Sequence, residues 1–559
     1  MPHVVTRSCC GDASCVYACP VNCIHPTPDE PDFGTAEMLY IDPVACVDCG
    51  ACVSACPVGA IKPHTALTGS ELPFLDINAA FHDPPAPRPV QAPVLPIRRA
   101  DPDRGPLRVA IVGSGPAAMY AADEVLKQDG ARVSVLDRLP VPYGLVRSGV
   151  APDHPETRRV TTLFAKIEAQ EGFDYHLGVE VGRDLALTDL LTHHHAVVYA
   201  TGASADRRLG IAGEDLPGSG TATAFVGWYN AHPEYADLEP DLSAERVVVV
   251  GNGNVALDVA RILATDPERL ARTDIADHAL EALRQSAVRE VIVLARRGAA
   301  QAAYTLPELT GLLARDDIEV VVDGDLCLDP ETVRRRAAGE LEATAELALQ
   351  AVEALPPASV PRGEKRRIVL RFGAQPRRIL GTDRVEGIEV ERTQVRCEDG
   401  RAVAVPTGDL EQIPAGAVLR SVGYRGVAVP GLPFDEPTGT VPHSSGRVEL
   451  PGVYVAGWIK RGPTGFIGTN KSCSAETVDT LVEDFNAGRL ATPTRSLEEF
   501  GELVRLVRPD VVDGTGWRRI RRFEQAWGER SGRPARRLVD PARMREIAAS
   551  TRVRLPAAL

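Results

Sequence analysis

Residues 46–57 read CVDCGACVSACP, a run of four cysteines that ends at a proline. Three of the cysteines follow at steps of three residues, and the fourth stands four residues further on. The spacing C-x2-C-x2-C-x3-C-P is typical of thiolates that ligate iron–sulfur clusters, and in two-cluster proteins the fourth cysteine ligates the other cluster. The run therefore predicts one cluster and implies a partner run elsewhere in the chain.

The partner run lies upstream, where residues 9–20 read CCGDASCVYACP. Its frame is the same, except that Asp12 stands where the second cysteine should be. CPVNCIHP from Cys19 and CPVGAIKP from Cys56 repeat one turn and strand, which confirms the register. The expected ligands of the first cluster are Cys9, Cys15 and, crossing over, Cys56, and those of the second are Cys46, Cys49, Cys52 and Cys19.

Asp12 determines what the first cluster is expected to be. A carboxylate is a harder donor than a thiolate and should hold the fourth iron less firmly. Two outcomes stay open, a three-iron cluster or a four-iron cluster with Asp12 as an oxygen ligand, and we expect the three-iron form in protein isolated in air. The second site should hold a four-iron cluster. Cys10 and Cys23 are interpreted as small core residues near the clusters, with a role as ligands as the alternative.

Other cysteine chemistries fit this pattern less well. The chain starts without the charged and apolar regions of a usual export signal, so we expect a cytoplasmic protein and no disulfide framework. A structural zinc site needs two well-separated cysteine pairs, whereas here three cysteines crowd into seven residues. Nine of the twelve cysteines precede residue 57, so the metal chemistry is confined to the front of the chain.

Length and charge limit the remaining functions. A chain of 559 residues should fold into several domains. No apolar run approaches the roughly 20 residues of a membrane helix, so no membrane partner is expected. The net charge of −14 argues against nucleic acid as a partner, since phosphate binding needs a surplus of lysine and arginine. The first 63 residues carry seven acids against two bases and are acidic in their own right.

Composition divides the front of the chain from the rest. Residues 1–78 are expected to form a small α+β iron–sulfur domain, with short strands at residues 3–5 and 38–41 packed against the cluster loops. Six of the thirteen residues in 84–96 are proline, which predicts a semi-rigid linker within residues 79–106.

After the linker, residues 107–118 read LRVAIVGSGPAA, a buried-strand pattern that runs into a glycine turn and then a helix. Gly113 would make the tight turn, Gly115 would let the backbone approach a pyrophosphate, and Ala118 replaces the third glycine where helix and strand pack. Asp137 ends the next strand 22 residues after Gly115, where a carboxylate for a ribose hydroxyl is expected. A glycine turn alone could be structural, but strand, helix and acid together favour a dinucleotide site.

The same unit occurs again at residues 246–263, RVVVVGNGNVALDVARIL, with Gly251 and Gly253 in the fingerprint positions. Its next strand ends in Arg296 and Arg297 instead of an acid. Arginine accommodates a 2′-phosphate that a carboxylate would repel, so this unit is predicted to bind NADP; the alternative is a solvated basic turn. Two such units suggest a flavin dinucleotide facing a nicotinamide dinucleotide. Further glycine turns within residues 197–203 and 453–470 are weaker candidates for flavin contacts.

Three longer motifs carry a family resemblance: GLVRSGVAPDHP at residues 144–155, GNGNVALDVARIL, and GWIKRGPTGFIGTNK. From about residue 107 onward the chain resembles the adrenodoxin-reductase-like ferredoxin:NADP reductases of the glutathione-reductase superfamily. The first 63 residues resemble bacterial ferredoxins with two clusters, and the whole resembles the fused ferredoxin/ferredoxin:NADP reductases of actinobacteria.

The resemblance implies an α/β fold with two Rossmann-like dinucleotide-binding domains behind a ferredoxin domain. The expected division is residues 1–78 for ferredoxin, 79–106 for the linker, 107–205 and 429–559 for the FAD domain with C-terminal helices, and 206–428 for the NADP domain. Residues implied at FAD are Gly113, Gly115, Ala117, Asp137, Leu145, Val181, Trp458, Gly465, Phe466 and Ile467. Residues implied at NADP are Asn252, Gly253, Asn254, Val255, Arg296, Arg297, Glu308 and Gly465. His154 is a candidate proton relay, with a structural hydrogen-bonding role as the alternative.

The implied activity is that of a ferredoxin–NADP⁺ reductase. NADPH would pass a hydride to the flavin, which would release electrons singly to the clusters and from there to redox-protein acceptors. A disulfide reductase is disfavoured because no cysteine occurs between Cys56 and Cys327. Two rivals stay open: the small subunit of a glutamate synthase, and an iron–sulfur sensor with a non-catalytic reductase, which the two intact glycine fingerprints disfavour.

Overall fold

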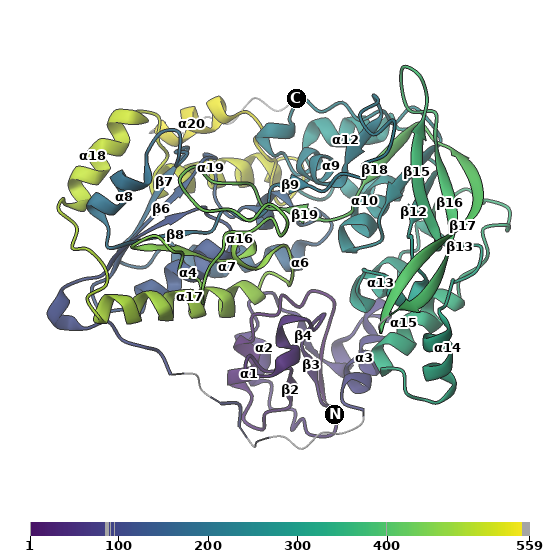
Figure 1. Cartoon of the computed structure of the whole chain (residues 1–559), viewed down its shortest axis with the longest axis horizontal. Coiled ribbons are helices and arrows are strands. Elements are labelled where there is room, and N and C mark those ends of the chain that lie inside the picture. The colour runs from purple at the N-terminus through teal and green to yellow at the C-terminus, as the bar shows by residue number, and fades with distance from the viewer. Residues whose placement is uncertain (1, 84–88, 90, 94–95, 399, 551–559) are drawn as a thin grey trace.

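The computed structural model describes residues 2–83, 89, 91–93, 96–398 and 400–550. Figure 1 shows three parts: a small N-terminal unit in purple, a parallel sheet at left, and a second parallel sheet with an antiparallel extension at right. The N-terminal unit lies below the place where the other two parts meet (Figure 1). The expected α/β architecture with a small leading domain is confirmed.

The N-terminal unit is built from two similar halves. Its elements are β1 (His3–Val5), α1 (Ser14–Ala18), β2 (Ile24–His25), β3 (Tyr40–Ile41), α2 (Ala51–Ala55), β4 (Ile61–Pro63) and α3 (Phe74–Phe81). β1 pairs with β4 and β2 pairs with β3, both antiparallel. The repeated sequence thus forms a repeated structure, a short helix followed by a strand, and the strand expected at residues 3–5 is confirmed.

Two expected bounds of this unit differ in the structure. The strand expected at residues 38–41 contains only Tyr40 and Ile41, because its pairing with β2 covers two residues. Helix α3 continues past residue 78 to Phe81. Asn78 lies inside the helix, and its side-chain oxygen accepts hydrogen bonds from the backbone nitrogens of Val5 (3.1 Å) and Ile41 (2.9 Å). The helix is thereby fixed to both small sheets. Most of the proline-rich stretch expected as a linker lies outside the described residues.

The first parallel sheet has the strand order β20-β8-β5-β6-β7. Its strands are β5 (Arg108–Val112), β6 (Arg132–Asp137), β7 (Phe173–Leu177), β8 (Ala196–Tyr199) and β20 (Val453–Val455). β5 and β8 are almost wholly buried, as is usual for parallel strands covered on both faces. β20 joins β8 with Tyr454 opposite Val198, so a late part of the chain completes this sheet.

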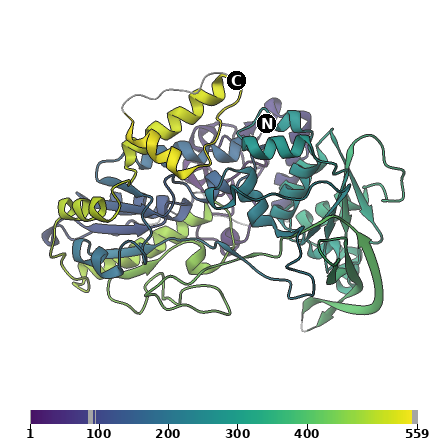
Figure 2. The same ribbon diagram turned by 90° about the horizontal axis from the view of Figure 1, so that it is seen from above.

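Helices surround the first sheet and extend to the C-terminus. They are α4 (Pro116–Leu126), α5 (Leu145–Ser148), α6 (Pro155–Arg158), α7 (Val160–Ile167), α8 (Leu187–His193), α16 (Trp458–Arg461), α17 (Thr469–Asn486), α18 (Leu497–Val507), α19 (Gly514–Glu529) and α20 (Pro541–Ala549). The C-terminal helices, yellow in Figure 2, lie on top in that view. Glu524 of α19 accepts two bonds from Arg147 of α5, at 2.9 and 2.5 Å, with both side chains buried.

The second parallel sheet has the order β10-β18-β11-β12-β14-β13, and an antiparallel sheet β15-β16-β17 extends from it. The elements of this part are β9 (Ala205–Asp206), β10 (Ser219–Thr221), α9 (Ala222–Tyr229), β11 (Arg246–Val250), α10 (Asn254–Ala264), α11 (Pro267–Leu270), α12 (Asp277–Arg284), β12 (Glu290–Leu294), α13 (Leu306–Leu313), β13 (Ile318–Asp323), α14 (Pro330–Ala337), α15 (Ala343–Glu353), β14 (Arg366–Arg371), β15 (Ala374–Leu380), β16 (Gly387–Glu398), β17 (Arg401–Pro414), β18 (Ala417–Arg420) and β19 (Tyr424–Arg425). The predicted strand and helix at residues 246–263 are confirmed, whereas the next predicted strand, expected to end in Arg296 and Arg297, ends at Leu294.

Two connections join the large sheets. β9 and β19 pair antiparallel where the chain leaves the first sheet and where it returns. After α19, the chain crosses back to the second part, where Arg533 forms an ion pair of 2.6 Å with Asp277 of α12.

The N-terminal unit shares one continuous apolar core with the first sheet, including Val16, Phe74 and Tyr120. No helix in the described part of the chain has the length and apolarity that crossing a bilayer requires.

Candidate functional site

The first glycine turn forms a cradle at the carboxyl end of β5. Gly113 has φ +105°, and a Cβ there would lie 2.4 Å from the carbonyl oxygen of Ala200, so only glycine fits. Next to the turn is a cavity of about 380 Å³. The cavity is lined by Gly113, Asp137, Arg138, Val181, Thr201 and Pro430, among others. A pocket at the strand ends, beside a helix N-terminus, suits the adenosine half of a dinucleotide.

Asp137 lines this cavity, but its carboxylate is already bonded to the protein. Oδ2 accepts from the backbone nitrogen and hydroxyl of Ser114, at 2.9 and 2.5 Å, and Oδ1 accepts from the Leu139 nitrogen at 2.9 Å. Burial raises the pKa of Asp137 even with these bonds. The carboxylate therefore shapes the glycine turn, and its expected bond to a ribose hydroxyl stays a prediction.

The other residues expected at FAD lie around the same turn. A Cβ at Gly457 would meet the Cβ of Ala117 at 2.5 Å, which brings the loop before α16 directly onto α4. Trp458, the first residue of α16, donates from its indole nitrogen to the Thr464 carbonyl at 3.1 Å, and in the loop between α16 and α17 the Phe466 nitrogen donates to the Thr469 hydroxyl at 3.0 Å. The remaining residues are Gly115, which caps α4; Leu145, which begins α5; Val181, in the cavity wall; and Gly465 and Ile467, in the loop before α17.

The second glycine turn repeats the first. Gly251 has φ +116°, and a Cβ there would lie 2.1 Å from the carbonyl oxygen of Ser421. Asn252 and Asn254 use their side-chain oxygens to accept from the backbone nitrogens of Ala303 (3.4 Å) and Thr305 (2.8 Å). The predicted nucleotide residues therefore hold the loop that leads into α13. Gly253 caps α10, and Val255 lies in its first turn.

The strand predicted to end in Arg296 and Arg297 stops earlier: β12 ends at Leu294, and the two arginines lie in a bend just after it. Arg296 is exposed and Arg297 is half-buried. Their backbone carbonyls accept hydrogen bonds, from the Thr393 hydroxyl at 2.7 Å and the Gly373 nitrogen at 3.1 Å. Within the described residues neither guanidinium has a hydrogen-bonding or ion-pair partner. Two unpaired guanidinium groups at the end of a strand beside a glycine turn are available to bind a phosphate.

The two cysteine runs lie on the short helices of the N-terminal unit. Cys15 and Cys52 are buried, Cys49 is exposed, and Cys9, Cys19, Cys46 and Cys56 are half-buried; all twelve cysteines of the chain are free thiols. Backbone nitrogens of Cys23 and Ala60 donate to the sulfurs of Cys19 (3.4 Å) and Cys56 (3.2 Å). Thiolate sulfurs that accept N–H bonds suit iron–sulfur ligation, so the donor set fits the expected clusters.

Asp12 and the two remaining cysteines are buried in the same unit. The Asp12 carboxylate accepts from the Ser14 hydroxyl at 2.5 Å and lies 3.7 Å from the Lys471 ammonium. Cys23 Sγ lies 3.4 Å from Cys19 Sγ. Cys10 contacts the first-sheet part instead, because its carbonyl accepts from the Gly468 nitrogen at 2.6 Å. The first cysteine run thus touches the loop that contains Gly465, directly before α17.

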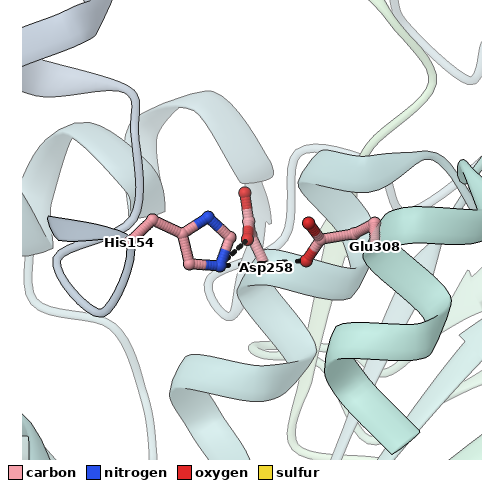
Figure 3. Close-up of side chains that lie close together, drawn as sticks. All are labelled: His154, Asp258 and Glu308. Carbon is pink, nitrogen blue, oxygen red and sulfur yellow. Dashed lines mark ion pairs between the residues drawn. The ribbon is translucent and has the colours of Figure 1, made fainter. Parts of the chain in front are cut away.

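His154, Asp258 and Glu308 converge from three elements (Figure 3). His154 directly precedes α6, Asp258 lies on α10 and Glu308 lies in the first turn of α13. His154 Nε2 is 3.8 Å from Asp258 and 4.0 Å from Glu308. Arg261, which is fully buried, donates to both carboxylates at 2.6 Å. It also pairs with Asp153 at 2.8 Å.

Arg7 adds a second guanidinium to this cluster from the N-terminal unit. Its Nη2 donates to Glu308 at 2.7 Å and also contacts His154 Nε2. Because a guanidinium only donates, His154 Nε2 accepts and the neutral ring carries its proton on Nδ1. Burial, Arg261 and Arg7 lower the pKa of His154 to about 3, against the opposing effect of Glu308. Although the three ligand-type side chains are close enough to hold a metal ion, two guanidiniums among them repel a cation.

The sequence alone indicated some residues of this cluster and not others. Asp153 and His154 belong to the quoted stretch APDHP, and Asp258 and Arg261 lie one helical turn apart in the second fingerprint helix. Their meeting was not predicted, because it depends on how three separate elements pack. Arg7 stands in an undistinguished stretch after β1, and nothing in its neighbourhood indicates a partner 301 residues away.

These features define a class of protein: an oxidoreductase with two dinucleotide-binding units and an iron–sulfur unit. Residues 107–301 match the family model described as pyridine nucleotide-disulphide oxidoreductase, and residues 8–60 match the 4Fe-4S dicluster domain. The probable ferredoxin/ferredoxin–NADP reductase of Mycobacterium bovis is 53% identical over 571 residues, which cover 99% of this chain and 95% of the relative. The chain belongs to the ferredoxin/ferredoxin–NADP reductase family.

Relatives of the reductase part agree with this assignment. The solved structure of Mycobacterium tuberculosis FprA in complex with NADPH is 43% identical, with a TM-score of 0.74, and covers 80% of this chain and 100% of its own. The mitochondrial NADPH:adrenodoxin oxidoreductase of Arabidopsis thaliana is 40% identical over 78% of this chain and 94% of the relative. Although one matched family model is named for disulphide chemistry, its segment here contains no cysteine.

Proposed function

We propose that this ferredoxin–NADP reductase moves electrons between NADP(H) and its own iron–sulfur clusters by way of FAD. The observation that carries the proposal is the contact between the Cys10 carbonyl and the Gly468 nitrogen. It joins the first cysteine run to the loop of residues 465–467, which we assign to the flavin. The backbone of the first cysteine run therefore lies directly against this loop.

FAD is assigned to the first glycine turn and NADP(H) to the second. The cradle at Gly113, where a side chain cannot fit, and the adjoining cavity support the first assignment. The unpaired Arg296 and Arg297 support the second, because a 2′-phosphate supplies the anion that they lack. The proposed FAD contacts are Gly113, Gly115, Ala117, Asp137, Leu145, Val181, Trp458, Gly465, Phe466 and Ile467. The proposed NADP contacts are Asn252, Gly253, Asn254, Val255, Arg296, Arg297, Glu308 and Gly465.

The clusters are assigned to the seven cysteines of the two runs. Cys9, Cys15 and Cys56 would hold the first cluster, a three-iron cluster or a four-iron one with Asp12 as a ligand. Cys19, Cys46, Cys49 and Cys52 would hold a four-iron cluster. The exposed Cys49 brings the second cluster to the surface, where redox proteins would accept electrons.

When bound, NADPH supplies a hydride to FAD, and FAD delivers electrons singly to the clusters. The protein's own groups position these partners and control charge around them. His154, held neutral by burial and two arginines, adds no positive charge at the junction and keeps a proton on Nδ1 as the candidate relay. Burial raises the pKa of Glu308, but the Arg7 and Arg261 guanidiniums outweigh that effect and lower it, so the carboxylate stays ionised.

We propose a domain division that follows the sheets. The ferredoxin domain covers the expected residues 1–78 and extends to Phe81, where α3 ends. The linker follows up to residue 106. The FAD domain covers residues 107–205 and 429–559, and the NADP domain residues 206–428, with the boundaries at the β9–β19 pair. None of the described cysteines forms a disulfide and seven are assigned to iron–sulfur clusters, which suits a reducing compartment, so we propose a cytoplasmic location.

Anaerobic titration of the full-length, cofactor-loaded protein with NADPH tests the function. We expect bleaching of the flavin absorption, followed by the electron paramagnetic resonance signals of reduced clusters. The same titration with NADH is the control and should need far more coenzyme. An unchanged visible spectrum with NADPH, or flavin bleaching that never reaches the clusters, would contradict the proposal.

A further inference from the structure

Helix α13 is held by two side chains of the N-terminal unit. Glu37 accepts a hydrogen bond from the Leu306 nitrogen at 2.8 Å and so caps the first residue of the helix, where a carboxylate is favourable. Two residues further on, Arg7 donates to Glu308 at 2.7 Å. Gly311 leaves room for Arg7, because a Cβ there would lie 2.4 Å from its Nη1. The N-terminal unit therefore fixes both the start and one face of this helix.

The opposite side of the same helix start is held by the nucleotide unit. Asn254 accepts from the Thr305 nitrogen at 2.8 Å, and Thr305 in turn caps α13 through its hydroxyl. Asn252 accepts from the Ala303 nitrogen at 3.4 Å. The loop before α13 is thus fixed between residues assigned to NADP(H) and residues of the N-terminal unit, and neither set fixes it alone.

A cavity of about 520 Å³ opens at this junction. Its lining includes Arg7, Cys9, His154, Asn254, Glu308 and Phe466. Three parts of the chain therefore form its walls: the N-terminal unit, the first-sheet part and the second-sheet part. Asn254 and Glu308 are the assigned NADP residues within it and Phe466 is the assigned FAD residue, so this cavity is where the nicotinamide end of the coenzyme would reach the flavin.

We propose that the N-terminal unit completes the NADP(H) site: Arg7 and Glu37 are positioning residues that hold α13, and with it Glu308, in the arrangement that binds the nicotinamide end. The inference rests on the proposed function, since it concerns the same coenzyme site. Its consequence is reciprocal. Coenzyme binding strengthens docking of the N-terminal unit by the same factor by which docking strengthens coenzyme binding.

NADP⁺ affinity in the full-length, cofactor-loaded protein tests the inference, measured from the change in flavin absorption on titration with NADP⁺. Arg7→Gln removes a charge-assisted bond and should raise the Kd about tenfold or more. Glu37→Ala removes a helix cap and should raise it about threefold to tenfold. Arg7→Lys, which keeps the charge but not the two-nitrogen geometry, should recover part of the loss. The matched control is Arg98→Gln, because Arg98 lies outside this cavity and pairs with Asp479 at 3.2 Å; its Kd should equal that of the wild type.

Hydrogen exchange of the backbone amides of residues 306–313 gives the second readout. Exchange there should be faster in Arg7→Gln and in Glu37→Ala than in the wild type, and slower in every form when NADP⁺ is added. An Arg7→Gln protein that binds NADP⁺ as tightly as the wild type, or more tightly, would overturn the inference and leave the proposed function intact. Weaker binding without faster exchange in α13 would also overturn it, because Arg7 would then act through charge alone. A wild type that binds no NADP⁺ would refute the proposed function itself.

Discussion

Gly468→Ala should separate the ferredoxin domain from the flavin loop without changing either nucleotide fold. A Cβ at residue 468 would lie 2.2 Å from the Asp12 nitrogen and 2.2 Å from the Gly11 carbonyl carbon, whereas ordinary contacts begin at 3.4 Å. The facing backbone must retreat by about 1.2 Å, and backbone cannot rotate away as a flexible side chain would. Overpacking of this kind costs about 1 to 3 kcal/mol.

The same shift breaks the bond of 2.6 Å between the Gly468 nitrogen and the Cys10 carbonyl, which contributes about 0.5 to 1.5 kcal/mol more. Together these effects should lower the ratio of docked to undocked ferredoxin domain by roughly 10- to 2000-fold. The linker would still tether the domain, so undocking slows electron delivery instead of abolishing it.

Rapid mixing with NADPH under anaerobic conditions is the assay. At saturating NADPH, ferricyanide, which takes electrons from the flavin, should be reduced at the wild-type rate, while the cluster signals should appear much more slowly. Gly69→Ala is the matched control, because Gly69 lies in the same domain with no atom within 4 Å of the added Cβ and no positive φ. Cluster reduction at the wild-type rate in Gly468→Ala would show that electrons do not pass at this contact.

Replacing both Arg296 and Arg297 with uncharged residues should raise KM for NADPH by about ten- to a hundredfold per arginine and leave NADH almost unchanged, because only NADPH carries the 2′-phosphate; equal loss for both coenzymes would contradict the assignment. Asp12→Cys should convert the first site to an air-resistant four-iron cluster and remove a three-iron resonance signal of the oxidised protein. A wild type without that signal, together with unchanged iron content in the variant, would show that Asp12 does not lie at the fourth iron and would make Cys10 or Cys23 the ligand to test. Burial beside Glu342 raises the pKa of Glu37 to about 7, although its backbone hydrogen bond opposes the rise. Since the docked form then holds the proton on Glu37 more tightly, docking of the ferredoxin domain should weaken as pH rises from about 4.5 to 7 and level off above, whereas Glu37→Gln should dock independently of pH. Small-angle scattering of the two proteins should therefore differ in this pH window. Identical pH profiles would refute the role of Glu37 in docking.

Local sequence patterns predicted most of the fold. The glycines at residues 113 and 251 could be placed because a strand that turns directly into a helix demands a backbone conformation that only glycine adopts freely. The two cysteine runs could be placed for the same reason, since their spacing is set by the ligand geometry of a cluster. In each case the physical requirement is met within about twenty residues of chain.

Contacts between distant parts of the chain could not be predicted. Asp137 stands at the expected position, yet its carboxylate turns to Ser114, because side-chain direction depends on the packed turn and not on position alone. Arg7 and Glu37 show no local pattern that sets them apart from other surface charges. Their roles arise only when the N-terminal unit packs against α13. Such docking between distant segments produces no periodic pattern in the sequence from which it could be predicted.

The pairing of β20 with β8 has a consequence for how the enzyme is made. Tyr454 lies opposite Val198, so about 250 further residues must be synthesised after β8 before the first sheet gains its edge strand. At about 5 to 20 residues per second, a ribosome needs roughly 12 to 50 seconds to supply them. During that time the cysteine-rich front of the nascent chain has already been synthesised, while β8 still presents an open edge that invites aggregation. Cells that overproduce this enzyme should therefore gain from chaperones that cover this edge during synthesis.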